Sequence, residues 1–263
     1  MTDQPTTWAA LFSSMAALLS AVAWPAVVAW FLFVNRVRIA FLLKVLGRKL
    51  SSAKKLKLGQ FEIEEELAEA VSEAGAEVDE AHTPNAVPKN QLRAAKDLKK
   101  KVVDSSAPKS EVLEAVRDQI FDLASQYESI RAEMQSGPIR TRRMNEIAAG
   151  MRTLALAGLP LRTELTRSKI AGGRLAAICM LQVEPRPRYF RWLIDRLKTE
   201  SHAFILFQAA LAILELVKKR LYINVEETRS AILDAVRVIS AFPGGQPDQN
   251  TLDALNEALG QVK

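Results

Sequence analysis

Uncharged positions are concentrated near the N-terminus of this chain. From Trp8 to Val34, 27 consecutive residues carry no charged side chain. As a helix that rises about 1.5 Å per residue, this run would extend roughly 40 Å, which is more than the ~30 Å hydrocarbon core of a bilayer requires. The pattern therefore predicts a single transmembrane helix over 8–34. Ala21-Val22-Ala23 resembles a signal-peptidase site, but the uncharged run continues past it and no lysine or arginine precedes it.

Basic residues follow this run and set its orientation. They are Arg36, Arg38, Lys44, Arg48, Lys49, Lys54, Lys55 and Lys57. Because basic flanks stay in the cytoplasm, we expect 1–7 outside and the C-terminal side in the cytoplasm. The alanine- and arginine-rich composition suggests a bacterial inner (plasma) membrane. Apolar positions at helical spacing predict that 35–58 is a basic juxtamembrane helix on the anionic inner leaflet, although a plain stop-transfer flank would look the same.

An acidic run comes next. Residues 61–80 contain nine acidic side chains and no basic one. They lack the ligand spacing and glycine turn of a calcium loop, so we expect a solvated face that an anionic bilayer repels. A helix is expected over 64–74, and the glycine and prolines of 75–90 predict a flexible linker.

Seven apolar positions then alternate at spacings of three and four residues. They are Leu113, Val116, Ile120, Leu123, Tyr127, Ile130 and Met134. Such an a/d pattern is typical of a coiled-coil seam, and Gly137-Pro138 ends it. A seam through which two copies associate and a helix packed on its own domain predict the same pattern.

The remaining residues give helical patterns separated by short breaks, over 141–157, 168–182, 187–199, 202–220, 225–241 and 248–261. The pattern over 202–220 is apolar nearly all round, which predicts a central, buried helix. Gly172-Gly173 lies within a helical pattern and predicts close helix packing. The fold class is therefore all-α. The expected parts are an external tail (1–7), a transmembrane helix (8–34), a juxtamembrane helix (35–58), an acidic run with linker (59–108), a heptad helix (109–137) and a compact helical-hairpin domain (138–263).

An internal repeat lies within this last part. Arg174–Leu181 realigns with Phe207–Leu214 at an offset of 33 residues, with paired alanines in both segments. With Tyr189–Leu197 as the preceding outer helix, the region 165–240 resembles HEAT-like helical repeats. It lacks the valine-arginine pair that usually opens the inner helix of that family. The resemblance implies a short right-handed stack of helical hairpins that serves as a binding surface, and any compact helical bundle would give similar alanine and leucine lines.

Candidate chemistry is sparse. The chain has one cysteine and two histidines, which leaves little for a thiolate zinc site, a histidine metal centre or a histidine-based triad. Cys179 lies on an apolar stripe between Ile178 and Met180 and is expected to be a buried structural thiol. No phosphate-loop or nucleophile-elbow motif occurs. We expect no enzymatic activity, no cofactor and no metal.

Positive charge is concentrated in 139–200, which holds thirteen basic and five acidic residues. The candidate partner surface consists of Arg140, Arg142, Arg143, Arg186, Arg188, Arg191 and Trp192. Arginines interleaved with aromatic residues can bind an acidic protein, anionic lipid, nucleic acid or the acidic run 61–80. They can also form a solvated surface without a partner.

These patterns favour a non-enzymatic, membrane-anchored cytoplasmic adaptor or scaffold that binds a protein partner and is able to self-associate. The alternatives are an oligomeric membrane effector that perturbs the bilayer or forms a pore, and a membrane tether for nucleic acid, which is not favoured.

The charge pattern predicts the result of reporter fusions. Green fluorescent protein fused after Lys263 should fluoresce, and alkaline phosphatase at the same place should be inactive, because the basic flank retains this side in the cytoplasm. Alkaline phosphatase before Met1 should be active. Phosphatase activity at the C-terminal fusion would contradict the orientation.

Overall fold

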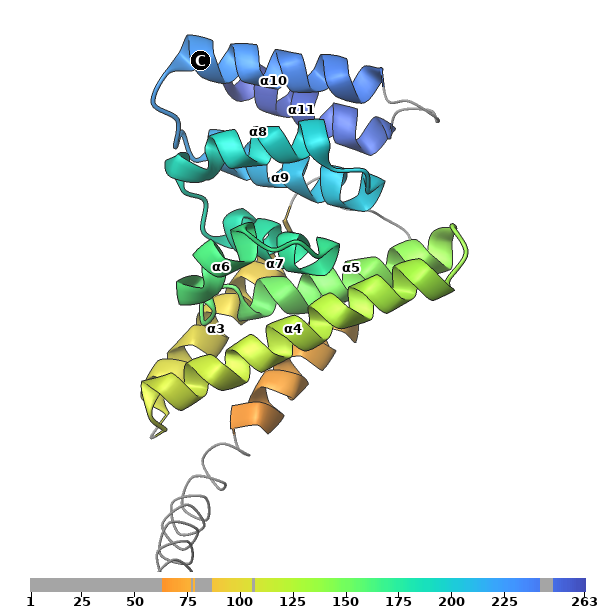
Figure 1. Ribbon diagram of the computed structural model, residues 1–263. Coiled ribbons are helices and arrows are strands. Elements are labelled where there is room, and N and C mark those ends of the chain that lie inside the picture. Colours follow the sequence, from red (N-terminus) through yellow and green to blue (C-terminus); the bar gives the residue numbers. More distant parts are fainter. Residues whose placement is uncertain (1–62, 77, 79–86, 106, 242–247) are drawn as a thin grey trace, which may run out of the picture. The chain divides into compact units, whose positions relative to one another are not determined.

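The computed structural model describes residues 63–76, 78, 87–105, 107–241 and 248–263 (Figure 1). The chain divides into two compact units, 1–58 and 59–263, and every described residue belongs to the second. The predicted span 8–34 and the basic stretch 35–58 lie outside the described residues. Among the helices of the described part, none is both long and apolar enough to cross a bilayer.

The described part of the second unit is built from ten α-helices, which confirms the all-α prediction. They are helix 63–76, α3 (Lys89–Asp104), α4 (Lys109–Glu133), α5 (Pro138–Leu154), α6 (Arg162–Thr166), α7 (Ala171–Val183), α8 (Phe190–Thr199), α9 (Ala203–Lys218), α10 (Val225–Ser240) and α11 (Gln249–Gln261). Two 3₁₀ turns, η1 (Leu159–Leu161) and η2 (Pro187–Tyr189), precede α6 and α8.

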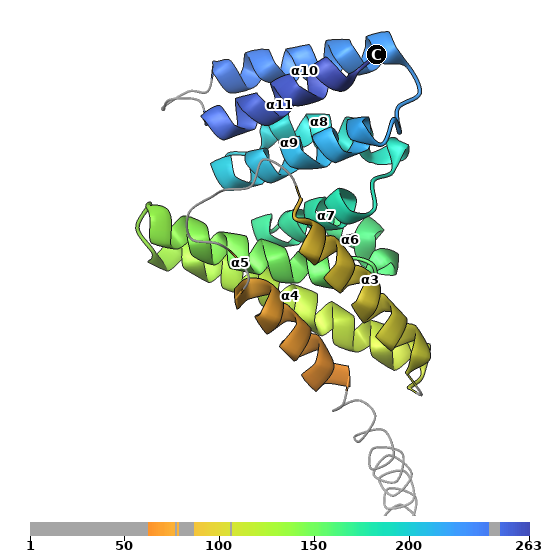
Figure 2. The same cartoon turned by 180° about the vertical axis from the view of Figure 1, so that it is seen from behind.

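Consecutive helices pair into hairpins that stack on one another (Figures 1 and 2). Helix α7 packs on α9 and α9 packs on α11, while α8 and α10 pack together beside them. The α4–α5 hairpin lies against α7, and α3 lies against α5. The two segments of the 33-residue repeat lie on the neighbouring helices α7 and α9, so each presents its alanine pair within this inner row.

Helix α9 occupies the centre of the stack, as its apolar sequence predicts. All but a few of its residues are buried, including Phe204 at its start and Val217 at its end. It contacts α7, α8 and α11. The Cys179 side chain on α7 is fully buried in the same core, which is the position expected for a structural thiol.

The segment expected to be an acidic run with a linker differs most from the prediction. Helix 63–76 corresponds to the helix expected over 64–74, but it is more than a solvated face, because it adds Leu67 to the core. Helix α3 was not expected, and it adds Leu98 to the core. The apolar pattern does not predict α3, because this helix is rich in lysine and one of its three buried residues is the polar Gln91. The heptad helix expected over 109–137 does not form a part of its own. It is α4, which shares one hydrophobic core with α5 and α7.

Helix α7 approaches α4 closely at Gly172. A Cβ atom built at this residue would overlap the backbone of Ala124. This confirms the close packing expected from Gly172-Gly173, and it explains why a residue with low helix propensity opens a helix here.

Substitution of this glycine should destabilise the unit. Gly172→Ala is expected to lower the free energy of unfolding by about 1–3 kcal/mol, because the added methyl group forces α7 away from α4. The control is Gly260→Ala in α11, where a Cβ atom meets nothing within 4 Å, and where alanine should be neutral or stabilise by about 0.5 kcal/mol. Urea unfolding of 59–263, followed by circular dichroism, measures both. Equal stability of the two variants would contradict this packing.

Candidate functional site

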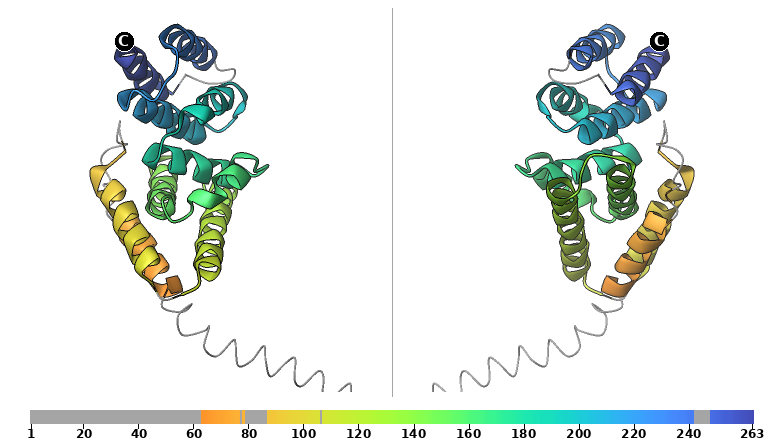
Figure 3. Two further views of the ribbon diagram at one scale, coloured as in Figure 1. Left: turned by 90° about the vertical axis from the view of Figure 1, so that its left-hand side faces the viewer. Right: turned by 90° about the vertical axis from the view of Figure 1, so that its right-hand side faces the viewer.

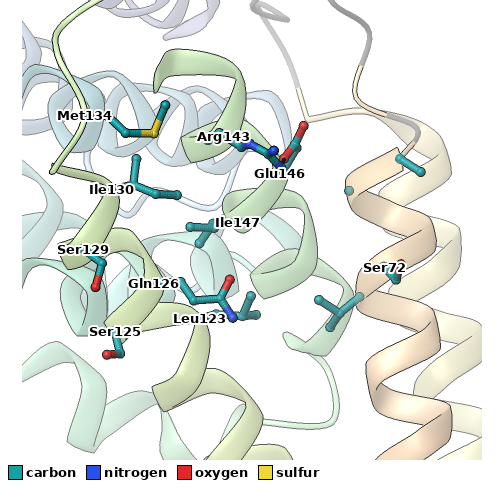
Figure 4. A pocket seen from close by; sticks show the side chains of 13 residues that line it. Ser72, Leu123, Ser125, Gln126, Ser129, Ile130, Met134, Arg143, Glu146 and Ile147 are labelled. Atoms are coloured by element: carbon teal, nitrogen blue, oxygen red, sulfur yellow. Dashed lines mark hydrogen bonds and ion pairs between the residues drawn. The ribbon is translucent and has the colours of Figure 1, made fainter. Parts of the chain in front are cut away.

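An open groove of about 710 Å³ lies between helix 63–76, α4 and α5 (Figure 4). Its floor is apolar. The apolar side chains that line it are Val71, Leu123, Ile130, Met134 and Ile147. They come from three separate segments of the chain, so only the folded unit assembles this surface.

Polar side chains surround this floor. The polar lining residues are Ser72, Ser125, Gln126, Ser129, Arg143 and Glu146. At one end of the groove, the Glu146 carboxylate accepts hydrogen bonds from Arg142 Nε at 3.2 Å and Arg143 Nη1 at 3.1 Å. Gln126 donates to Asp122 on the same helix at 2.8 Å. The rim is therefore able to donate and accept hydrogen bonds at several points above an apolar floor.

Small residues hold the two walls at this separation. A Cβ atom at Gly150 of α5 would lie 2.9 Å from Val71 Cγ1 and 3.4 Å from Leu123 Cδ1. Helix 63–76 therefore touches α5 at this glycine, and Gly75 near its end lies beside Glu146. The groove opens beyond these contact points.

Three of the predicted partner-surface residues lie at the start of α5, at one edge of the unit. Arg142 and Arg143 pair with Glu146, and Arg143 lines the groove. Arg140 instead donates to the carbonyl of Met134, just past the end of α4, at 3.2 Å. Such a cation at a helix C-terminus stabilises the orphan carbonyl groups.

The other predicted arginines lie at the opposite edge, where α8 and α10 begin (Figures 1 and 2). Arg186 pairs with Glu184 at 2.6 Å, and Arg191 pairs with Glu227 at 2.6 Å. A smaller hollow of about 250 Å³ is lined in part by Arg191 and Arg188. The structure therefore divides the predicted surface into two separate groups, and nearby acids neutralise part of each.

Two further members of the predicted surface make contacts within the unit. Arg188 Nη2 donates to the Tyr189 hydroxyl at 3.1 Å, and its guanidinium lies over the Tyr189 ring. Trp192 is half-buried, and its Nε1 donates to the carbonyl of Thr166 at 3.1 Å. The tryptophan therefore contributes to the α6–α8 contact.

The seam predicted for self-association faces the core of its own chain. Val116, Ile120, Leu123 and Tyr127 are buried, whereas Leu113, Ile130 and Met134 are partly exposed. Helix α4 uses this stripe against α5 and α7. A second copy could reach the buried part of the seam only by displacing those helices.

Sequence reasoning missed a buried polar cluster that joins four helices. The Arg152 side chain on α5 is 4% exposed. Its three guanidinium nitrogens donate to the side-chain oxygens of Gln182, Gln91 and Gln208 at 2.6, 2.8 and 2.6 Å. Gln182 also donates to the backbone carbonyl and the side-chain oxygen of Gln208. Lone glutamines within the apolar runs of α7 and α9 were the available signal.

Burial lowers the pKa of the Arg152 guanidinium below its ordinary value. No carboxylate among the described residues binds it, so three neutral amides stabilise the charge. The nearby Cys179 thiol has its pKa raised to about 11, because burial outweighs the effect of the guanidinium. This thiol stays protonated at neutral pH and is a poor nucleophile.

A second polar cluster lies where α7 meets the turn between α8 and α9. Arg174 Nε donates to Glu200 Oε2 at 2.8 Å, and the Glu200 side chain is 2% exposed. Burial and the neighbouring Arg131 lower the pKa of His202 below its ordinary value, although Glu200 partly offsets them. The imidazole is therefore neutral at pH 7. No group of three or more His, Cys, Asp or Glu side chains in the described part of the chain could hold a metal ion.

No family model matches the chain, and no curated protein or solved structure matches it either.

Removal of the buried guanidinium should destabilise the unit strongly. Arg152→Met is expected to lower the free energy of unfolding by about 3 kcal/mol or more, because the three glutamines lose their shared donor. Arg188→Met, at an exposed arginine, should change it by less than about 0.5 kcal/mol.

Arg152→Lys keeps the charge but lacks the planar guanidinium. Its free energy of unfolding should therefore lie between those of Arg152→Met and Arg188→Met. Urea unfolding of 59–263 measures the series. A stable Arg152→Met variant would show that the glutamines satisfy one another without the guanidinium.

Proposed function

We propose that this chain is a membrane-anchored cytoplasmic adaptor, which binds an amphipathic helix of a protein partner in the groove between helix 63–76, α4 and α5. The anchor is the uncharged run 8–34 with its basic flank. The binding domain is the helical unit 59–263. Two parts of the chain thus supply membrane attachment and partner capture.

The shape and chemistry of the groove carry this proposal. The wall formed by α4 and the residue after it extends from Leu123 to Met134, which corresponds to about three helical turns or roughly 16 Å. A linear apolar floor of this length suits apolar side chains at positions i, i+4 and i+7 of a bound helix. The serines and Gln126 at the rim can bind its flanking polar groups.

The lining residues favour binding over bond-making chemistry. Those described include no histidine, cysteine or aspartate, and the one carboxylate, Glu146, is held by two arginines. Among the described residues, no lining serine forms a hydrogen bond with a histidine or carboxylate that could act as its general base. A partner is therefore recognised by shape, apolar burial and hydrogen bonds.

The state of the arginines supports a protein partner over nucleic acid. The two groups lie at opposite edges of the unit, and Glu146, Glu184 and Glu227 each neutralise part of them. A surface that binds the phosphates along a nucleic-acid backbone needs a continuous row of basic side chains that acids do not neutralise. A groove with a neutral rim instead matches a protein helix.

Site-specific crosslinking in native membranes tests this function. A photoreactive amino acid at Gln126, on the groove rim, should give a discrete protein adduct, whereas the same group at Glu114, which is exposed on α4 outside the groove, should not. Mass spectrometry identifies the adduct.

A blocking substitution provides the matched control. Ser129→Trp fills the groove and should reduce the adduct at least about tenfold, because a buried aromatic side chain displaces the bound apolar residues. Ser110→Trp makes the same change at an exposed position of α4 outside the groove and should leave the adduct unchanged. Identical adducts at positions 126 and 114, or an adduct that survives Ser129→Trp, would contradict the proposal.

A further inference from the structure

Helix 63–76 and α3 lie side by side as a hairpin (Figures 2 and 3). Exposed acidic residues lie on the first helix and most exposed basic residues on the second. The two helices touch through an ion pair between Glu66 Oε1 and Lys101 Nζ at 2.9 Å. Side chains of both also line a furrow between them. Each helix uses its other face for packing: α3 contacts α5, and Val71 meets α5 at Gly150.

Helix α3 presents a basic stripe to solvent. Its buried residues, Gln91, Ala95 and Leu98, recur at spacings of four and three. The exposed bases Lys89, Arg93, Lys96 and Lys100 repeat at four, three and four on the opposite side of the helix. Neighbours at these spacings repel one another. Within the described part of the chain, none of these four bases forms a hydrogen bond or ion pair, and the apolar Val103 beyond Lys100 is 66% exposed.

Helix 63–76 presents an acidic stripe beside it. The residues Ile63, Leu67 and Ala74 are buried, and Glu65, Glu69 and Glu73 are exposed. These three glutamates form no hydrogen bond or ion pair with the other described residues. The face thus carries an acidic line on helix 63–76 and a longer, mainly basic line on α3, which also includes the exposed Asp97 and Asp104. Glu66 first, and then Glu69 and Glu73, raise the pKa of Lys101, so part of their charge is balanced within the hairpin.

We propose that this hairpin face binds the same face of a second copy of the chain, with the acidic stripe of each copy over the basic stripe of the other. A two-fold axis parallel to the helices, midway between the facing hairpins, produces this superposition. Such an interface is isologous, because each contact occurs twice. It places the three glutamates of each copy opposite bases of the other copy and covers Val103.

The direction of the helices fits two chains in one membrane. Rotation about an axis parallel to helix 63–76 leaves the direction of that helix unchanged. The residue-63 ends of both copies therefore point the same way, as two anchors in one bilayer require. This geometric point rests on the proposed function, whereas the charge complementarity does not. Confinement to a membrane also raises the effective concentration of copies, which favours a weak electrostatic contact.

Charge-reversed full-length chains test the proposal, with sedimentation velocity in detergent at low and high salt as the measurement. Reversal of the acidic stripe (Glu65→Lys, Glu69→Lys, Glu73→Lys) should weaken self-association at least about tenfold, because like charges then face each other. Reversal of the basic stripe (Arg93→Glu, Lys96→Glu, Lys100→Glu) should do the same. A 1:1 mixture of the two variants should associate again, and so should a chain that carries all six changes.

A matched control places three like changes elsewhere. Glu114→Lys, Asp118→Lys and Glu133→Lys lie at exposed positions of α4 and should leave association unchanged. Circular dichroism checks that every variant is folded. A monomeric parent chain at low salt, single reversals without effect, or a mixture that fails to associate would each overturn the proposal. None of these results depends on the groove. The crosslinking experiment therefore tests the adaptor function independently of self-association.

Discussion

The unit depends on one buried cation, the Arg152 guanidinium. Removing an ion from water costs several kcal/mol even after relaxation, and good hydrogen-bond geometry must offset this. Here three glutamine oxygens from α3, α7 and α9 bind one side chain on α5. Since no carboxylate among the described residues supplies an opposite charge, the positions of these amides matter more than they would in an ion pair. The cluster therefore sets how four helices lie relative to one another.

Helix α3 is held by this cluster as well as by apolar burial. Its buried residues are Gln91, Ala95 and Leu98, and Leu92 and Val102 are partly buried against the core. The hydrogen bond from Arg152 to Gln91 adds a specific attachment to α5. The hairpin partner of α3, helix 63–76, forms one wall of the groove and carries the acidic stripe. The candidate binding groove and the charged face thus depend on the same buried arginine.

The sequence was sufficient to predict helix 63–76 and, through periodicity, the helices from α4 onwards, apart from the short α6. Their apolar residues recur at helical spacing, and glycine or proline marks most of the breaks. Helix α3 was missed because a glutamine stands where the pattern needs an apolar residue. The groove could not be found either, since Val71, Leu123 and Ile147 belong to segments far apart in the sequence. The partners of the arginines, such as Glu227 for Arg191, are likewise a property of the tertiary fold.

Folding also changes what the linear charge blocks mean. Several basic residues of 139–200 serve the fold: Arg162 donates to the carbonyl of Glu184 at the end of α7, and Arg174 binds the buried Glu200. The acidic helix, in contrast, lies beside the lysine-rich α3, and most charges of that hairpin face solvent. A block that is basic in sequence is thus partly neutralised, whereas the hairpin keeps most of its exposed acids on one helix and its exposed bases on the other. The charges that remain exposed after folding therefore differ from those that the linear blocks suggest.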